Sequence, residues 1–137
     1  MNVGIIGLGL IGGSFAKAYK TAGHTVYAHD IDQSILDFAI LSGAADARLE
    51  SDSMKSCMLI LIALNPRDAI KFLDETAQNI PPEAAVIDCC GTKKNVCAAG
   101  LKRLPDMDLL LWADIRWLAP NSPGSSTAEQ ASLRGHP

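Results

Sequence analysis

The sequence predicts an α/β domain in which a doubly wound parallel sheet carries helices on both faces. Two observations predict this class. Apolar stretches of strand length alternate with amphipathic stretches of helix length along residues 1–111, which is typical of βαβ units. Gly7, Gly9 and Gly12 form a Gly-x-Gly-x-x-Gly pattern that joins the first apolar stretch to the first helical one. This order of strand, glycines and helix is typical of Rossmann-type dinucleotide-binding domains.

The glycine loop follows a predicted buried strand at residues 3–6 and begins a helix that Gly23 ends. Gly7 permits a tight turn, Gly9 lets a pyrophosphate approach the backbone, and Gly12 lets helix and strand pack closely. The helix N-terminus offers free N–H groups and a positive dipole end to phosphates. The alternative is a glycine-rich turn that binds no ligand. The apolar residues at helical spacing are Ile11, Phe15, Ala18, Tyr19 and Ala22. The predicted cofactor-binding residues of this loop are Gly7, Leu8, Gly9, Leu10, Ile11 and Gly12.

An acidic residue ends the second predicted strand, which spans residues 24–30. Asp30 lies about 20 residues beyond the glycines, where a carboxylate binds the adenosine ribose hydroxyls of NAD. Asp32 adds a second carboxylate, and no Arg or Lys stands beside the pair, so the 2′-phosphate of NADP would meet like charges. We therefore predict NAD rather than NADP, and the chain offers no evident flavin site for FAD. Asp32 has a structural alternative as the N-cap of the next helix.

The middle of the chain predicts a helix at residues 33–42, which Gly43 ends, and a short strand at residues 44–49. Residues 50–56 are polar and are expected to form a connection. Residues 57–64 are an unalternated apolar run, as expected of a central parallel strand covered on both faces. One face of the predicted helix holds Ile35, Leu36, Ala39 and Ile40.

The next helix is predicted to have Asn65 as its cap and Pro66 in its first turn, and to end before Pro81. A strand at residues 84–88, a helix reaching residue 104 and a strand at residues 108–112 follow. The inner face of the helix that Asn65 caps is predicted to hold Ala69, Ile70, Leu73 and Ala77.

Sheets of this kind bind ligands at the carboxyl ends of their strands, near the point where the strand order reverses. The loops at residues 7–12, 30–32, 63–66 and 88–93 are therefore predicted to form the site. Outside the glycine loop, the predicted cofactor contacts are Asp30, Asp32, Ala63, Leu64, Asn65 and Asp88.

Charge, hydropathy and cysteine content argue against several classes of function. The chain has 137 residues and a net charge of −3, which suits one domain and gives no reason to expect a nucleic-acid or acidic-membrane partner. No apolar run approaches the ~20 residues of a membrane span, and the N-terminal run lacks the basic region of a signal peptide. The four cysteines form no CxxC pair and have no histidine at zinc-ligand spacing. We therefore expect no metal site, and reduced thiols in a cytoplasmic protein.

Three segments together resemble the dinucleotide-binding domain of prephenate dehydrogenases. They are residues 3–14, which contain the string GLGLIGGS, then Asp30, and the Asp-Cys-Cys-Gly-Thr-Lys sequence at residues 88–93. The resemblance implies oxidation of prephenate to 4-hydroxyphenylpyruvate by hydride transfer to NAD with loss of carbon dioxide, a step of tyrosine biosynthesis. It also implies that Gly91, Thr92 and Lys93 border the nicotinamide and the substrate. Many members have a serine where Gly91 stands.

The chain departs from this family beyond residue 111. Members continue with a Gly-Gly-His-Pro-Met-Ala-Gly-Thr-Glu segment whose histidine acts as general base, whereas residues 112–124 contain no histidine. In a shifted reading frame, each codon consists of the third base of one residue's codon and the first two bases of the next codon. A coding sequence for residues 112–124, read in this shifted frame, can encode that histidine-containing segment. We therefore expect residues 112–137 to be an irregular, out-of-frame tail, with a natural linker as the alternative.

The family also carries a C-terminal helical domain that forms its homodimer and closes the substrate site. Without that domain and the histidine, the chain is expected to bind NAD weakly, to lack turnover, to form no stable dimer and to expose apolar surface. The residues do not distinguish prephenate from arogenate as the substrate. Two other classes remain open: another NAD-dependent dehydrogenase of the same fold, and a non-catalytic nucleotide-binding module.

Overall fold

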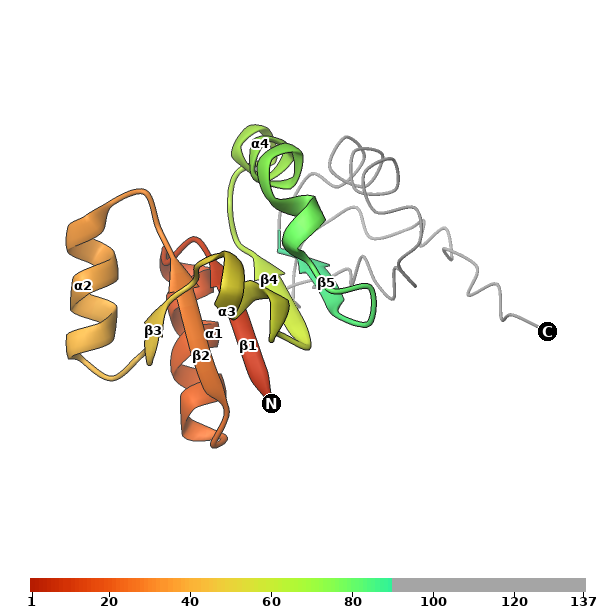
Figure 1. Cartoon of the computed structure of the whole chain (residues 1–137). Coiled ribbons are helices and arrows are strands. Elements are labelled where there is room, and N and C mark those ends of the chain that lie inside the picture. The colour runs from red at the N-terminus through yellow and green to blue at the C-terminus, as the bar shows by residue number, and fades with distance from the viewer. Residues whose placement is uncertain (90–137) are drawn as a thin grey trace, which may run out of the picture.

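The computed structural model describes residues 1–89, and these form one parallel sheet with helices on both faces (Figure 1). The sheet order is β3-β2-β1-β4-β5, and every neighbouring pair is parallel. The chain moves outward from β1 to β3 and then returns to the other side of β1, so the strand order reverses between β1 and β4. This confirms the predicted fold class. The strands are β1 Asn2–Ile6, β2 Thr25–His29, β3 Ala47–Arg48, β4 Leu59–Ile62 and β5 Ala85–Asp88.

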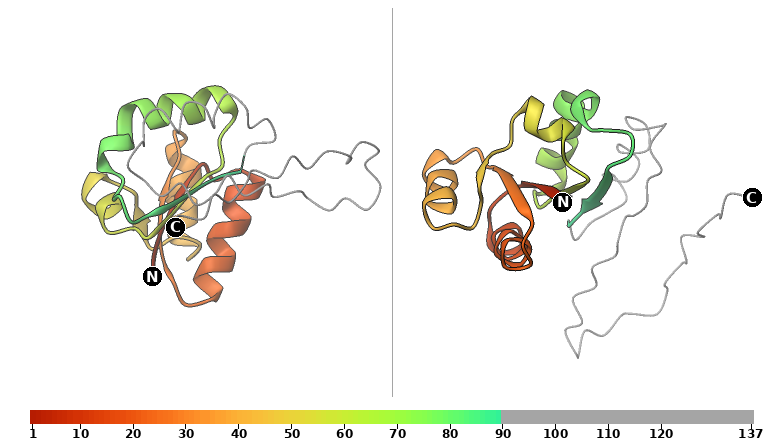
Figure 2. Two further views of the ribbon diagram at one scale, coloured as in Figure 1. Left: turned by 90° about the vertical axis from the view of Figure 1, so that its right-hand side faces the viewer. Right: turned by 60° about the horizontal axis from the view of Figure 1, so that its bottom comes forward.

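Helices α1 and α2 cover one face of the sheet, and α3 and α4 cover the other (Figure 2). Two separate cores result, because neighbouring residues of a strand point to opposite faces. In β4, Leu59 and Leu61 belong to the core beneath α1 and α2, whereas Ile60 and Ile62 belong to the core beneath α3 and α4. The helices are α1 Leu10–Thr21, α2 Gln33–Leu41, α3 Ser51–Lys55, α4 Pro66–Thr76 and a 3-10 turn Ala77–Asn79.

The predicted helix ends and caps are confirmed where the structure describes them. Gly23 and Gly43 follow α1 and α2 with φ of 88° and 78°, which only glycine adopts readily. Asp32 caps α2 by accepting hydrogen bonds from the backbone N–H groups of Ser34 and Ile35. Asn65 caps α4 by accepting from the N–H of Asp68 at 2.9 Å.

The buried stripe of α1 differs from the apolar pattern of its sequence. Ile11, Ala18 and Ala22 are exposed, whereas Gly12 and Ala16 are the buried positions of the helix. This face of α1 is buried because Gly12 packs directly against the Gly7 carbonyl. The sequence pattern did not reveal this face, because glycine is not counted as an apolar residue in the helical periodicity. In the next helices Ile35 is exposed, and Phe72 is a buried residue of α4 that the predicted inner face omitted.

Residues 50–56 were predicted to be a connection, and this is wrong because residues 51–55 form α3. Its capping box explains the helix: the Glu50 side chain accepts from the N–H of Ser53, and the Ser53 hydroxyl accepts from the N–H of Glu50. Met54 then anchors α3 in the core. The strand predicted at residues 44–49 is shorter than expected, since only Ala47–Arg48 pair with β2.

Cys57 lies just before β4 and is fully buried, where desolvation raises the pKa of its thiol to about 11. Cys57 is a free thiol. Within residues 1–89 no group of His, Cys, Asp and Glu side chains could hold a metal ion, and no helix there is long and apolar enough to cross a membrane. Cys90, Cys97, the predicted helix to residue 104, the strand at residues 108–112 and the tail at residues 112–137 lie outside the described residues.

Candidate functional site

The candidate site lies at the carboxyl edge of the sheet, where the chain leaves β1 and β4 in opposite directions. Gly7 follows β1, Asp30 follows β2, and Ala63 follows β4 at this same edge. Gly7 donates its N–H to the His29 carbonyl and Ala63 donates to the Ile6 carbonyl, each at 2.8 Å. The loops after β1, β2 and β4 are therefore held together by the sheet, as the sequence predicts.

Two glycines of the loop are required by the close approach of other backbone atoms. Gly7 has φ of 91°, and a Cβ placed on it would overlap the Ala63 carbonyl. A Cβ on Gly12 would overlap the carbonyl oxygen of Gly7 and come within 3.2 Å of the Ala63 Cβ. Any side chain at either position would thus push β1, α1 and the loop after β4 apart.

Gly9 differs from both, because a Cβ built on it meets no atom of residues 1–89 within 4 Å. Its backbone faces open space, and it is the N-cap of α1 without any side-chain hydrogen bond to the helix. The first turn of α1 contains no acidic residue either. This helix end therefore keeps first-turn N–H groups and the positive dipole end available to an anion. The shape and the chemistry of the cradle fit a pyrophosphate.

Asp30 joins two loops of the site through its carboxylate. Its Oδ2 accepts the N–H of Leu8 at 2.8 Å, and its Oδ1 accepts the N–H of Asp32 at 2.9 Å. Within residues 1–89, no Lys or Arg pairs with it. Each carboxylate oxygen has two acceptor positions, so both can still accept from hydroxyl groups. A ribose diol fits this acceptor, whereas a phosphate would be repelled.

Asp32 is the N-cap of α2, which was the structural alternative to a cofactor contact. Its Oδ1 accepts the N–H of Ser34 at 2.9 Å and that of Ile35 at 3.4 Å, so the carboxylate caps α2. The cap also places a second negative charge beside Asp30. A direct contact between Asp32 and a cofactor stays a prediction.

The remaining predicted residues are placed around the same edge. Ala63 and Leu64 are half-buried, and Asn65 is exposed as the cap of α4. Asp88 ends β5, is fully buried, and lies in register with Ile62 of β4. Gly91, Thr92 and Lys93 lie outside the described residues.

The sequence did not predict a pocket beneath α3 and α4, on the face of the sheet opposite α1 and α2. His29 lines this cavity of about 310 Å³ together with Phe72, and the centroids of the two rings are 6.4 Å apart. Glu50 and Glu75 contribute carboxylates to its wall. The alternation of side-chain direction along β2 could have predicted that His29 lies on this face. Ala28 points toward α1, so the next residue, His29, must point to the opposite face.

The fold is shared with known dinucleotide-binding proteins. The family described as the NAD binding domain of 6-phosphogluconate dehydrogenase matches residues 2–133. The prephenate dehydrogenase of Aquifex aeolicus, solved with hydroxyphenyl propionate and NAD+, superposes with a TM-score of 0.67 at 22% identity over 76% of this chain and 38% of that one.

Two further structures show the same fold. The arogenate dehydrogenase of Synechocystis has a TM-score of 0.67 at 23% identity, over 75% of this chain and 37% of that one. The 3-hydroxyisobutyrate dehydrogenase of Mycobacterium tuberculosis has a TM-score of 0.68 at 13% identity, over 77% and 37%. The chain spans less than two-fifths of the length of each of these three proteins.

Proposed function

We propose that this chain, which belongs to the family of the NAD-binding domain of 6-phosphogluconate dehydrogenase, is the NAD-binding part of a prephenate dehydrogenase. Its domain is of the NAD-dependent oxidoreductase type. In the proposed reaction, prephenate gives up a hydride to the nicotinamide and loses carbon dioxide, which leaves 4-hydroxyphenylpyruvate. The observation that carries the cofactor part of the proposal is the glycine loop, in which the N-terminus of α1 has no side-chain cap and Asp30 accepts the N–H of Leu8.

The proposed roles follow from the geometry of the carboxyl edge. The pyrophosphate of NAD would lie on the open backbone of Gly9 and accept hydrogen bonds from the first turn of α1. The adenosine ribose would donate its hydroxyls to Asp30. Bound NAD supplies the hydride acceptor. The further proposed cofactor contacts are Gly7, Leu8, Leu10, Ile11, Gly12, Asp32, Ala63, Leu64, Asn65 and Asp88.

The choice of prephenate rests on the string GLGLIGGS and on residues 88–93, where Gly91, Thr92 and Lys93 are proposed to border the substrate. It is also supported by the Aquifex aeolicus protein, which was solved with an aromatic acid and NAD+. A dianionic substrate such as prephenate would gain from the positive charge of Lys93. The arogenate dehydrogenase of similar TM-score makes arogenate the nearest alternative substrate.

A second candidate is another NAD-dependent dehydrogenase of the same fold. The observation that favours it is the TM-score of 0.68 with a 3-hydroxyisobutyrate dehydrogenase. Both candidates use the same dinucleotide site and differ only in the substrate. Formation of NADH in the presence of prephenate, arogenate or 3-hydroxyisobutyrate would separate them. The assay requires a chain extended through the substrate domain in the reading frame of the family.

The cofactor assignment is tested by calorimetric titration of the chain with NAD and with NADP. We expect NAD to bind more tightly, because Asp30 and Asp32 repel a 2′-phosphate. Asp30→Ala should weaken NAD binding by about tenfold or more, since hydrogen bonds to a charged group contribute roughly 1.5–3 kcal/mol.

Comparing the affinities for NAD and NADP also separates the loss of the ribose contact from damage to the loop. Asp30→Ala should reduce the ratio of NAD affinity to NADP affinity, because it removes the charge that repels the 2′-phosphate. A disordered loop would instead lower both affinities equally. Asp37→Ala is the matched control, since Asp37 is an exposed acid that pairs with Arg48 away from the site. Equal affinity of the unmodified chain for the two cofactors would refute the assignment.

A further inference from the structure

A groove of about 420 Å³ separates α1 from α2 on the outer surface of the domain. Each helix lines it with residues spaced at i, i+3, i+4 and i+7, so one stripe of each helix faces the other. The lining combines small residues with large apolar side chains. The stripe of α1 is Leu10, Gly13, Ser14 and Lys17, and that of α2 is Ile35, Phe38 and Ala39 with the C-cap Ser42.

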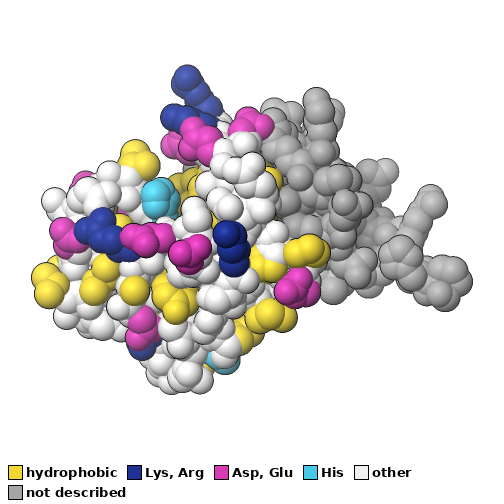
Figure 3. All heavy atoms as spheres, in the orientation of Figure 1, with side chains coloured by type: hydrophobic (Ala, Val, Ile, Leu, Met, Phe, Trp, Pro, Cys, Tyr) yellow, Lys and Arg dark blue, Asp and Glu magenta, His cyan; other side chains and the backbone are white. Residues whose placement is uncertain are grey.

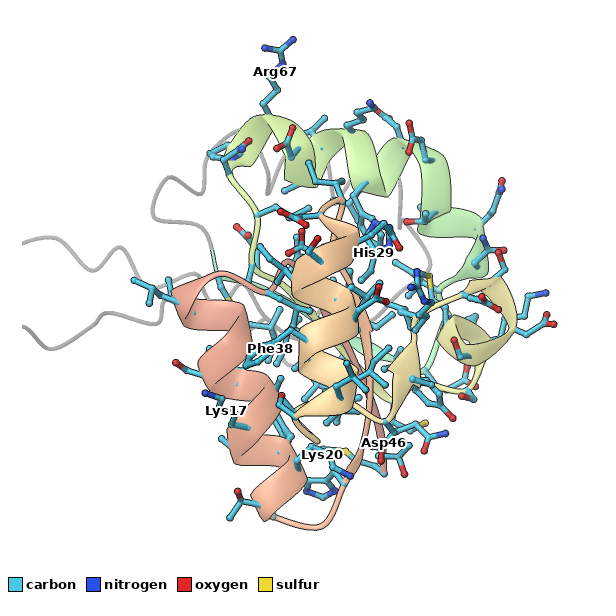
Figure 4. All side chains as sticks on the ribbon, turned by 90° about the vertical axis from the view of Figure 1, so that its left-hand side faces the viewer. Lys17, Lys20, His29, Phe38, Asp46 and Arg67 are labelled. Atoms are coloured by element: carbon cyan, nitrogen blue, oxygen red, sulfur yellow. The ribbon has the colours of Figure 1, made fainter. Side chains whose placement is uncertain are left out.

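The walls of this groove expose apolar surface that a folded domain normally buries. Leu10 is 93% exposed, Phe38 69% and Ile35 41%. Figure 4 shows Phe38 in the gap between α1 and α2, and Figure 3 shows hydrophobic side chains at the surface over α2. Exposed apolar side chains grouped around a concave surface are typical of a binding site.

Among the described residues that line the groove, Lys17 is the one charged residue and none is acidic. Lys17 forms no ion pair within residues 1–89. The two hydroxyls of the lining donate to backbone carbonyls instead, Ser14 to Leu10 and Ser42 to Ala39. Lys17 is therefore the one lining side chain whose donors are not used inside the described fold.

We propose that this groove binds a small carboxylate with an elongated apolar body. Lys17 would pair with the carboxylate, and Phe38, Ile35 and Leu10 would cover the apolar part. Leu10 and Lys17 are seven residues apart on α1, which gives an apolar stretch of about 10 Å. The carboxylate would lie at the Lys17 end of the groove, and the apolar body would extend along the groove toward Leu10.

The groove adjoins the ribose and phosphate contacts proposed above and shares three lining residues with them. Leu8, Gly9 and Leu10 form one end of the groove and also belong to the glycine loop. If the proposed function holds, a ligand in the groove and NAD on the loop would change each other's affinity by the same factor. The test below uses no dinucleotide in its primary readout, so failure of NAD to bind would leave it intact.

The experiment is calorimetry of the full chain with octanoate, 4-phenylbutanoate and octan-1-ol. The two acids distinguish acyl from aryl ligands, and the alcohol is a neutral analogue. We expect saturable binding of at least one acid with one site per chain. Lys17→Gln should weaken acid binding about fivefold, the upper range for an exposed charge pair, and should leave octan-1-ol unchanged. Phe38→Ala should weaken both by about tenfold through lost apolar contact.

Two control variants match these changes outside the groove. Lys71→Gln removes an exposed lysine of α4, and Leu41→Ala shortens an exposed leucine of α2 that does not line the groove. Neither should change the affinity for the acids. The proposal is overturned if Lys17→Gln has no larger effect on the acids than on octan-1-ol. It is also overturned if light scattering shows a dimer that Phe38→Ala dissociates, since a second copy would then be the occupant.

Discussion

Gly12 and Gly13 are neighbours in one helix, but only one of them lacks room for a side chain. A Cβ on Gly12 overlaps the Gly7 carbonyl, whereas a Cβ on Gly13 has its nearest atom, the Leu8 carbonyl oxygen, at 3.5 Å. Gly12→Ala should lower the free energy of unfolding by about 1–3 kcal/mol, the typical range for overpacking. Gly13→Ala should raise it by about 0.5–1 kcal/mol, because alanine is the better helix former. Urea unfolding of both variants measures the difference, and equal effects would contradict the packing argument.

Gly9 allows the binding role of the loop to be separated from its folding role. The methyl group of Gly9→Ala meets no atom of the described part of the chain within 4 Å, and the residue has an extended backbone with φ of −66°. Its free energy of unfolding should change by less than about 1 kcal/mol. The affinity for NAD should nevertheless fall about tenfold or more, because the methyl group would occupy the space proposed for the pyrophosphate. Unchanged calorimetric affinity in this variant would mean that the pyrophosphate lies elsewhere.

The glycines also show what the residue pattern could and could not predict. The Gly-x-Gly-x-x-Gly spacing predicted a turn, an open backbone and a close contact at three positions, and the backbone geometry of Gly7, Gly9 and Gly12 fits these. The orientation of α1 was not predictable from apolar periodicity, since Gly12 is buried without being hydrophobic. Asp30 was found from its distance in sequence to the glycines, but its two backbone partners are visible only in three dimensions.

Asp46 connects three elements of the α1 side of the sheet. It accepts hydrogen bonds from the Lys20 ammonium of α1 at 2.6 Å and from the Val26 N–H of β2 at 2.8 Å, and it directly precedes β3. Figure 4 shows Lys20 and Asp46 side by side at the end of α1. The hydrogen bond from Lys20 and then that from Val26 hold the pKa of Asp46 below its ordinary value.

The lowered pKa of Asp46 predicts a pH-dependent contribution to stability. A carboxyl whose pKa is depressed in the folded state stabilises it above the unfolded pKa, about 3.9, and loses this effect as the pH falls through the folded pKa. Asp46→Asn should lower the free energy of unfolding at pH 7 by about 1 kcal/mol or less, since the pair is partly exposed. Urea unfolding from pH 7 to about pH 2 should show the difference shrinking below about pH 4. Asp52→Asn, an exposed acid 3.9 Å from Lys55, serves as the control.

At the scale of elements, prediction succeeded where local sequence alone determines the structure. The Asn65 cap, the Pro66 start and the apolar run of β4 needed no tertiary information. It failed at α3, which is five residues long and is held by a capping box whose N-cap is a glutamate rather than Ser, Thr, Asp or Asn. It also overestimated β3, because only two residues at this sheet edge pair with β2.

For the whole molecule, the alternation of strands and helices predicted the doubly wound parallel sheet, whereas the strand order β3-β2-β1-β4-β5 was not predicted. The position of the site was predicted from the rule that such sheets bind ligands at the carboxyl ends of their strands. The groove between α1 and α2 was not predictable, because it depends on how two helices pack against each other. The substrate-side residues Gly91, Thr92 and Lys93 stay predictions from resemblance.

We propose that the chain beyond residue 111 is translated out of frame, and the coding DNA tests this directly. A single-base change at or shortly before the codon of Trp112 should restore an open frame that encodes the histidine-containing segment of prephenate dehydrogenases. Expression of the restored frame should then give NADH formation with prephenate. The proposal is wrong if no such change opens a frame with that histidine, and residues 112–137 would then be a natural linker.

Asp30 also affects the conformational entropy that is lost when a ligand binds. Its carboxylate already fixes the Leu8 amide, and the His29 carbonyl already fixes the Gly7 amide. Two amides of the glycine loop are thus held in place before a ligand arrives, although glycines lose more backbone freedom on ordering than other residues. This part of the loop is ordered by the fold, so less conformational entropy opposes association. A preorganised loop of this kind would let even a small domain retain measurable affinity for its ligand.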